Sequence, residues 1–286
     1  MTSGAPPQDH QTKSDARTTP EILRRVVSAI VLAAVALGAV VASPWSFAAL
    51  VAVAGGLLAW EWGGLTRESG FDGTALIQAI SIVALAVFVT LGRFDLALFV
   101  LGAACVAMVF GGTRGTRAVW SVAGLAYIAL PAWSLVWLRS DPELGTAAVL
   151  YVLAVAWTTD TASYVGGRTI GGPTLAPRIS PKKTWSGLIV GTLTPALVGY
   201  IFALLLGNTS PWLLALVSIV LAVACQAGDL VESAIKRHFG VKDMSQLIPG
   251  HGGLFDRIDS LLLAAVAAAL IALRDPAEPG AGLLIW

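Results

Sequence analysis

Long windows without any charged residue are the feature that most constrains the fold of this chain. Such windows span residues 26–60, 73–92, 96–113, 118–138, 144–159, 184–228 and 260–273. A helix that crosses a lipid bilayer needs about 20 predominantly apolar residues. The windows 26–60 and 184–228 are too long for one crossing, and each contains a break signal, Ser43-Pro44 in the first and residues 207–211 in the second. The pattern therefore predicts an all-α, polytopic membrane protein with about nine transmembrane helices.

The distribution of basic residues predicts the orientation of these helices. Nine crossings with a cytoplasmic N-terminus place 15 of the 18 Lys and Arg residues on the cytoplasmic side and leave Arg93, Arg139 and Arg274 outside, as the positive-inside rule requires. Residues 1–20 are polar and are predicted to form a disordered tail without a signal peptide. Residues 21–286 are expected to form a single transmembrane catalytic domain.

Composition excludes several classes of protein. Hydrophobic residues make up 56% of the chain and charged residues only 12%, which an ordinary soluble domain does not show. The net charge of +1 gives no signature of nucleic-acid binding. The two cysteines, Cys105 and Cys225, lie in apolar runs, so they indicate neither a disulfide framework nor a cysteine zinc site.

Polar residues concentrate in two segments on the predicted cytoplasmic side, 166–183 and 229–259. The second combines carboxylates, basic side chains and a glycine pair: Asp229, Glu232, Asp243, Asp256, Asp259, Lys236, Arg237, Lys242, and His251-Gly252-Gly253. Carboxylates bind Mg²⁺, whereas basic side chains and free backbone amides bind phosphate oxygens. The segment therefore predicts a phosphoryl-transfer site, where positioning and charge do most of the catalysis.

Helical spacing groups some of these residues. Asp229, Ser233 and Lys236 share one predicted helix face, and Asp256 and Asp259 share another. The alternative is a juxtamembrane loop whose charges pair with each other and with lipid headgroups. The position of Asp229 argues against it, because an ionisable residue at the end of an apolar window indicates a functional site.

Asp160 closes the window that begins at residue 144, and this helix is expected to continue to Val165. Asp160 shares a predicted helix face with Ser163, Tyr164 and Gly167. Two readings stay open: a site residue, or a carboxylate that bonds Ser163 or a neighbouring helix.

Ser180-Pro181 is predicted to begin the next helix, with Ser as N-cap and Pro at the first position. Lys182 and Lys183 would then lie in the first turn, where positive charge opposes the helix dipole. A docked anion would explain them, as would binding to anionic headgroups.

The second segment also contains the run Ser233-x2-Lys236-Arg237-x4-Lys242-Asp243-x-Ser245-x2-Ile248-Pro249-x-His251-Gly252-Gly253-Leu254-x-Asp256-Arg257-Ile258-Asp259. It resembles the signature of the phosphatidate cytidylyltransferases (CDP-diacylglycerol synthases) without a gap over about 27 positions. Trp157-x2-Asp160 and the run Ser180-Pro181-Lys182-Lys183-Thr184-Trp185-Ser186-Gly187 resemble further motifs of that family. Ser186 departs from the family, which more often has Glu there, and Ser163 stands where Ala is common.

The resemblance implies an enzyme that condenses CTP with phosphatidic acid to CDP-diacylglycerol and pyrophosphate, with Mg²⁺ and with K⁺ as a candidate second cation. It implies metal ligation by Asp229, Asp256 and Asp259, and catalytic roles for Asp229, Asp256, Lys242 and Asp243. Substrate contacts are expected from Asp160, Lys182, Lys183, Ser233, Lys236, Arg237, His251, Gly252, Gly253 and Arg257. The expected assembly is a homodimer in a bacterial inner membrane, with the site facing the cytoplasm.

Other classes remain as alternatives. A transporter or channel would explain the spans and the two intramembrane aspartates, but not the dense anion-and-metal segment. A CTP-dependent polyprenol kinase would use the same nucleotide on another lipid. The CDP-alcohol phosphotransferases are less favoured, because Asp256-x2-Asp259 is followed by Ser260 and not by Gly. A structural membrane protein would leave the charged segment unexplained.

Overall fold

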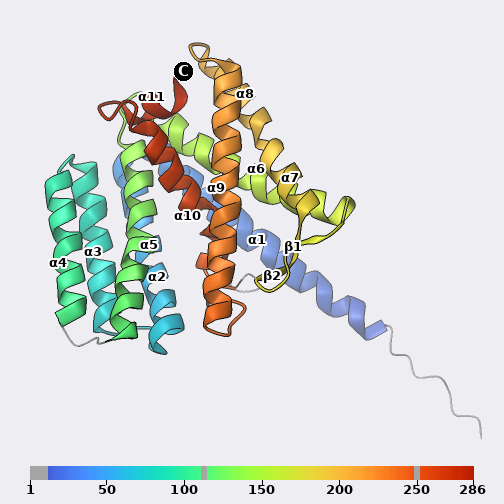
Figure 1. Ribbon diagram of the computed structural model, residues 1–286, viewed down its shortest axis with the longest axis horizontal. Coiled ribbons are helices and arrows are strands. Elements are labelled where there is room, and N and C mark those ends of the chain that lie inside the picture. The colour runs from blue at the N-terminus through green and yellow to red at the C-terminus, as the bar shows by residue number, and fades with distance from the viewer. Residues whose placement is uncertain (1–11, 111–114, 248–251) are drawn as a thin grey trace, which may run out of the picture.

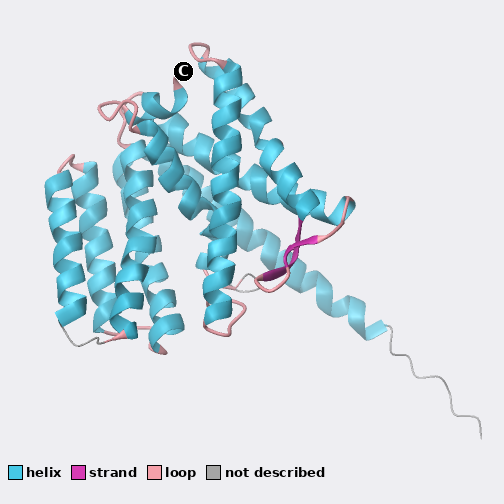
Figure 2. Cartoon of the chain, in the orientation of Figure 1, coloured by secondary structure: helices cyan, strands magenta, loops and turns pink. Residues whose placement is uncertain are grey.

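The computed structural model describes residues 12–110, 115–247 and 252–286, with the backbone alone for residues 12–26. These residues form helices and one short two-stranded hairpin (Figure 2). The elements have the following bounds: α1 (Thr12–Ala42), α2 (Pro44–Arg67), α3 (Gly73–Thr90), α4 (Phe94–Phe110), α5 (Thr116–Arg139), α6 (Gly145–Thr169), β1 (Thr174–Ala176), β2 (Ser180–Thr184), α7 (Trp185–Leu193), α8 (Pro195–Leu206), α9 (Pro211–His238), α10 (Phe255–Ala272) and α11 (Pro279–Leu284).

The breaks predicted inside the two longest windows occur where expected. α1 ends at Ala42, and Ser43 caps α2 through a reciprocal pair of hydrogen bonds with Ser46, an arrangement equivalent to a capping box. α8 ends at Leu206 and α9 begins at Pro211. Proline removes a backbone donor and fixes φ, so it starts a helix readily and continues one poorly.

The prediction of an all-α membrane fold is confirmed, but the count of nine crossings is not. Six helical segments in the described part of the chain are long and apolar enough to cross a bilayer: α2, α3, α5, α6, α7 with α8, and α9. Residues 27–42 of α1 and the whole of α4 are shorter apolar helices. Large apolar side chains such as Phe110, Leu205 and Trp212 are at least 75% exposed, which suits a surface that faces lipid.

The helices pack as a bundle in which α9 and α10 lie near the middle (Figure 1). α2, α3, α4 and α5 form one side of it, and α6, α7 and α8 form the other. α10 packs against α5, α6 and α9, so it joins the two sides. Its first residue, Phe255, is fully buried and contacts Trp62 of α2 and Tyr127 of α5, with ring centroids 6.0 and 5.9 Å away. The start of α10 is therefore anchored in the core.

Two features differ from the sequence-based expectation. α1 begins at Thr12, although the disordered tail was expected to reach residue 20; residues 1–11 lie outside the described part. The second difference is the antiparallel hairpin of β1 and β2, which lies beside the lower end of α9 in Figure 1. No strand was predicted there.

Candidate functional site

A cavity of about 630 Å³ opens where α6, the β-hairpin, α7, α9 and α10 meet. It brings together six of the residues that the sequence singled out, from segments up to about 100 residues apart: Asp160, Lys182, Lys183, Asp229, Asp256 and Asp259. Both charged segments of the sequence therefore contribute to one site. The rest of the wall includes Tyr164, Arg168 and Gln226.

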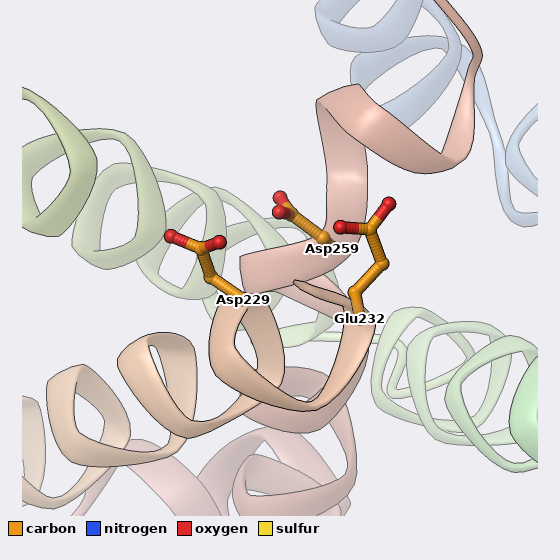
Figure 3. A group of neighbouring side chains, drawn as sticks. All are labelled: Asp229, Glu232 and Asp259. Atoms are coloured by element: carbon orange, nitrogen blue, oxygen red, sulfur yellow. The ribbon is translucent and has the colours of Figure 1, made fainter. Parts of the chain in front are cut away.

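Three carboxylates converge beside this cavity. Asp229 and Glu232 lie one turn apart on α9, and Asp259 reaches them from α10 (Figure 3). One oxygen atom from each lies within 4.8 Å of the other two. Gly228 permits this proximity, because a Cβ atom there would lie only 2.6 Å from the backbone oxygen of Asp259. The two helices thus touch directly beside the acidic cluster.

The chemistry of this cluster fits a divalent cation. Carboxylate oxygens are the hard ligands that Mg²⁺ takes in proteins. Glu232 is completely buried, and its Oε1 atom has no hydrogen-bond donor in the described part of the chain. A buried carboxylate oxygen without a donor is costly, and a cation would remove that cost.

Glu232 is the ligand candidate that the sequence interpretation did not select. The expected set was Asp229, Asp256 and Asp259, whereas the cluster contains Glu232 in place of Asp256. Its spacing from Asp229, three residues along one helix, was the signal that could have found it.

Two lysines neutralise part of this negative charge. The ammonium of Lys183 lies 2.6 Å from Asp229 Oδ2. Lys236 lies 2.6 Å from Glu232 and 2.6 Å from Asp256, and so bridges α9 to α10. The Lys236 and Asp256 side chains are 12% and 8% exposed, and ion pairs this far from water are only weakly screened by salt.

Asp256 is held by the loop that precedes it. Besides Lys236, its carboxylate accepts hydrogen bonds from the backbone N–H groups of Met244, at 3.1 Å, and Gly253, at 2.8 Å. Backbone N–H groups of Met244 and Gly253 thus bind a side chain that also lines the cavity. That Gly252 and Gly253 let the backbone approach a phosphate stays a prediction.

Asp160 joins α6 to α10. Its Oδ2 atom accepts a hydrogen bond from Ser260 Oγ at 2.8 Å. The bond to a neighbouring helix is therefore observed. Asp160 also lines the cavity, and its role as a site residue stays a prediction.

The prediction that a helix begins at Ser180-Pro181 is wrong. Residues 180–184 form β2, and α7 begins at Trp185 with Thr184 as its N-cap. The Thr184 hydroxyl accepts from Gly187 N, and Trp185 N–H donates to Pro173 O, so the cap and the hairpin together override the Ser-Pro signal. Lys182 and Lys183 therefore reach the cavity from a strand.

The other predicted residues surround the site without lining the cavity. Ser233 is half-buried on α9, Arg257 is exposed in the first turn of α10, and Lys242 and Asp243 are exposed after α9. Arg237 is exposed and donates to the backbone oxygens of Ile179 and Val241, which joins α9 to the hairpin. His251 lies outside the described residues.

A second acidic residue missed by the sequence interpretation is Glu61 on α2. It is 1% exposed and accepts hydrogen bonds from the loop and the first turn of α10. Nothing in its local sequence links it to a segment about 190 residues further along.

The fold and the site define a class of protein. An α-helical membrane bundle carries, at one end, a polar cavity in which acidic groups and lysines lie side by side. Such a site suits the binding and reaction of phosphate groups at a membrane surface.

Comparison with known proteins identifies the family. The model of the Cytidylyltransferase family matches residues 23–273, and the chain belongs to that family. A protein of Brucella suis biovar 1 named phosphatidate cytidylyltransferase is 35% identical over 264 residues, which cover 90% of this chain and 96% of the relative.

Two further relatives carry the same name. One, from Staphylococcus haemolyticus, is 42% identical over 146 residues, or 51% of this chain and 55% of the relative. The other, from Rickettsia bellii, is 41% identical over 149 residues, or 50% of this chain and 64% of the relative. The chain is thus a membrane-bound nucleotidyltransferase.

Proposed function

We propose that this protein transfers the cytidylyl group of CTP to phosphatidic acid and so forms CDP-diacylglycerol and pyrophosphate. The observation that carries the proposal is a cavity at the end of membrane helices that Asp229, Asp259 and Lys183 line, with Glu232 clustered beside the two aspartates. The names of the relatives supply the substrates.

The reaction matches the groups present. An oxygen of the lipid phosphate forms a bond to the α-phosphorus of CTP, while the bond from that phosphorus to the bridging oxygen breaks and pyrophosphate leaves. A phosphate monoester has a second pKa of about 6 and is largely ionised at pH 7, so no side chain has to remove a proton. The difficulty is to bring two polyanions together.

Basic side chains on the cavity reduce that repulsion. Lys182 and Lys183 reach it from β2, and Arg168 reaches it from α6. They would bind phosphate oxygens and align the attacking oxygen with the leaving group, which is a large part of phosphoryl-transfer catalysis. Acyl chains would stay in the bilayer while the headgroup enters the cavity.

Mg²⁺ would be held by Asp229, Asp259 and Glu232, with Asp256 as a further ligand. When bound, it supplies positive charge that stabilises the negative charge of the transition state. K⁺ is a second candidate cation for the same acidic group. The homodimer and the placement in a bacterial inner membrane, with the cavity facing the cytoplasm, remain part of the proposal.

The test uses purified protein in detergent micelles with phosphatidic acid, Mg²⁺ and either α-labelled or γ-labelled CTP. Lipid-linked α-label that requires both phosphatidic acid and Mg²⁺ supports the proposal. Asp259→Asn should lower it by at least about 100-fold, the order of effect expected when transition-state charge loses its stabilisation. The matched control is Asp95→Asn, since Asp95 is 65% exposed and pairs with Arg93 far from the cavity.

Two outcomes would overturn the proposal. Lipid-linked γ-label would identify a CTP-dependent lipid kinase. Folded wild-type protein without any lipid-linked label would favour transport or another activity.

A further inference from the structure

We propose that Glu61 is a positioning residue: it fixes the first turn of α10 and thereby places Asp256 and Asp259 at the site. Glu61 lies on α2, outside both charged segments of the sequence, and it does not line the cavity. The expected effect on catalysis rests on the proposed function, whereas the effect on α10 does not.

The contacts of Glu61 are directed at one short stretch of backbone. Its Oε1 atom accepts from Ser245 Oγ at 2.6 Å and from Leu254 N at 2.8 Å. Its Oε2 atom accepts from Phe255 N at 2.9 Å. Both oxygens of a side chain that is 1% exposed are therefore used, all by residues 184 to 194 positions away.

These bonds provide hydrogen-bond acceptors for backbone N–H groups at the start of α10. The first backbone N–H groups of a helix have no partner within the helix. Leu254 stands at the N-cap position and contributes no side-chain bond. The Glu61 carboxylate replaces the missing cap, and its negative charge is favourable at the positive end of the helix dipole. Hydrogen bonds to an ionised acceptor are stronger than those between neutral groups.

The close approach of Glu61 to Gly253 leaves no room for a side chain at residue 253. A Cβ atom at Gly253 would lie 2.7 Å from Glu61 Oε1, so a side chain larger than that of glycine would push the carboxylate away. The neighbouring residue, Trp62, packs on the ring of Phe255. α2 thus contacts Phe255 in two ways: Glu61 accepts from its backbone N–H, and Trp62 packs on its ring.

A short covalent path leads from these contacts to the acidic groups. Asp256 follows Phe255 directly, and the N–H of Gly253 donates to Asp256 Oδ2. Asp259 lies one helical turn further on α10 and belongs to the carboxylate cluster. Loss of the Glu61 bonds frees the turn that sets the direction of both side chains.

The experiment compares Glu61→Gln and Glu61→Ala with the wild type. Gln keeps the size of the side chain but loses its charge and part of its accepting capacity, whereas Ala loses all three bonds. The matched control is Glu68→Gln, an acid-to-amide change at an exposed residue that follows the end of the same helix. Three quantities are measured: amide hydrogen exchange of residues 252–258, thermal stabilisation by Mg²⁺, and kcat and KM for CTP.

In Glu61→Gln, we expect exchange of the Leu254 and Phe255 amides to rise by about 10-fold, with little change in α6 and α9, because a lost bond to a charged group opens the local structure. Stabilisation by Mg²⁺ should weaken, and kcat should fall by about 10- to 100-fold with KM for CTP within about 3-fold. Glu61→Ala should exceed Glu61→Gln in each respect, and Glu68→Gln should match the wild type.

Unchanged exchange at residues 252–258 in Glu61→Gln would overturn the proposal. So would increased exchange with undiminished kcat and undiminished stabilisation by Mg²⁺, since Glu61 would then only cap the helix. If the wild type lacks transferase activity, the proposed function fails, but exchange and Mg²⁺ stabilisation still decide the role of Glu61. Glu61→Gln alone suffices if Glu61→Ala does not fold.

Discussion

Removal of the Lys236 ammonium is expected to destabilise the protein strongly. This group lies 2.6 Å from both Glu232 and Asp256, whose side chains are 0% and 8% exposed. Lys236→Met keeps most of the side-chain volume and leaves two buried carboxylates without their shared cation. Breaking a buried ion pair from one side costs about 3–5 kcal/mol. At about 2–4 °C per kcal/mol for chains of this order of size, the midpoint of thermal unfolding should fall by about 6–20 °C.

The assay is thermal unfolding of detergent-solubilised protein at neutral pH without Mg²⁺, followed by loss of the monodisperse peak in size-exclusion chromatography. Adding Glu232→Gln to Lys236→Met should restore part of the loss, because one of the uncompensated charges disappears. Lys242→Met is the control, since Lys242 is exposed and its loss should change stability by less than about 0.5 kcal/mol. Equal midpoints for Lys236→Met and Lys242→Met would refute the reasoning.

Two further predictions concern packing and pH. Gly228→Ala places a Cβ 2.6 Å from the backbone oxygen of Asp259 and should lower activity by at least about 10-fold. The control Gly102→Ala adds a Cβ with no atom within 4 Å and should leave activity unchanged. Equal activities of the two variants would contradict the direct contact of α9 with α10. Burial raises the pKa of Asp72, but the hydrogen bond and charge of Arg67 together with the backbone N–H groups of Ala75 and Thr74 lower it more, so the pKa lies below its ordinary value of 3.8. The resulting stabilisation is present above pH 3.8 and is lost as the pH falls below it. Asp72→Ala removes this carboxylate and an N-cap, and it leaves the Arg67 side chain, which is 4% exposed, without this partner. It should therefore cost at least about 1 kcal/mol. The difference from wild type should shrink in unfolding scans toward pH 3, and a difference that grew there would have the wrong sign.

The helices could be predicted from sequence because the bilayer imposes a simple rule on them. A crossing needs a charge-free apolar stretch, and proline or glycine marks where one ends. α3 lies within the window 73–92, and Ser43-Pro44 lies at the junction of α1 and α2. These signals are local, so one sequence suffices to find them.

The site could be predicted only in part, because its remaining contacts join distant segments. The motifs supplied Asp160, Lys183, Asp229 and Asp259, which the fold brings to one cavity. Glu61 could not be found in this way, because its partners are fixed by the packing of α2 against the start of α10.

The Ser180-Pro181 signal failed for a related reason. A local preference for a helix start lost to the hairpin, in which β2 pairs with β1 and Thr184 supplies the cap. Tertiary context routinely overrides such preferences.

The long sequence separation between Glu61 and its partners has a consequence for how the protein is made. Leu254 and Phe255 lie 193 and 194 positions after Glu61. A ribosome that adds about 5–20 residues per second therefore completes α2 about 10–40 s before it reaches them. During that interval the nascent bundle holds a carboxylate whose donors have not yet been synthesised. Synthesis of the start of α10 supplies these donors, so the last long helix completes both the acidic site and the hydrogen bonding of Glu61 on α2.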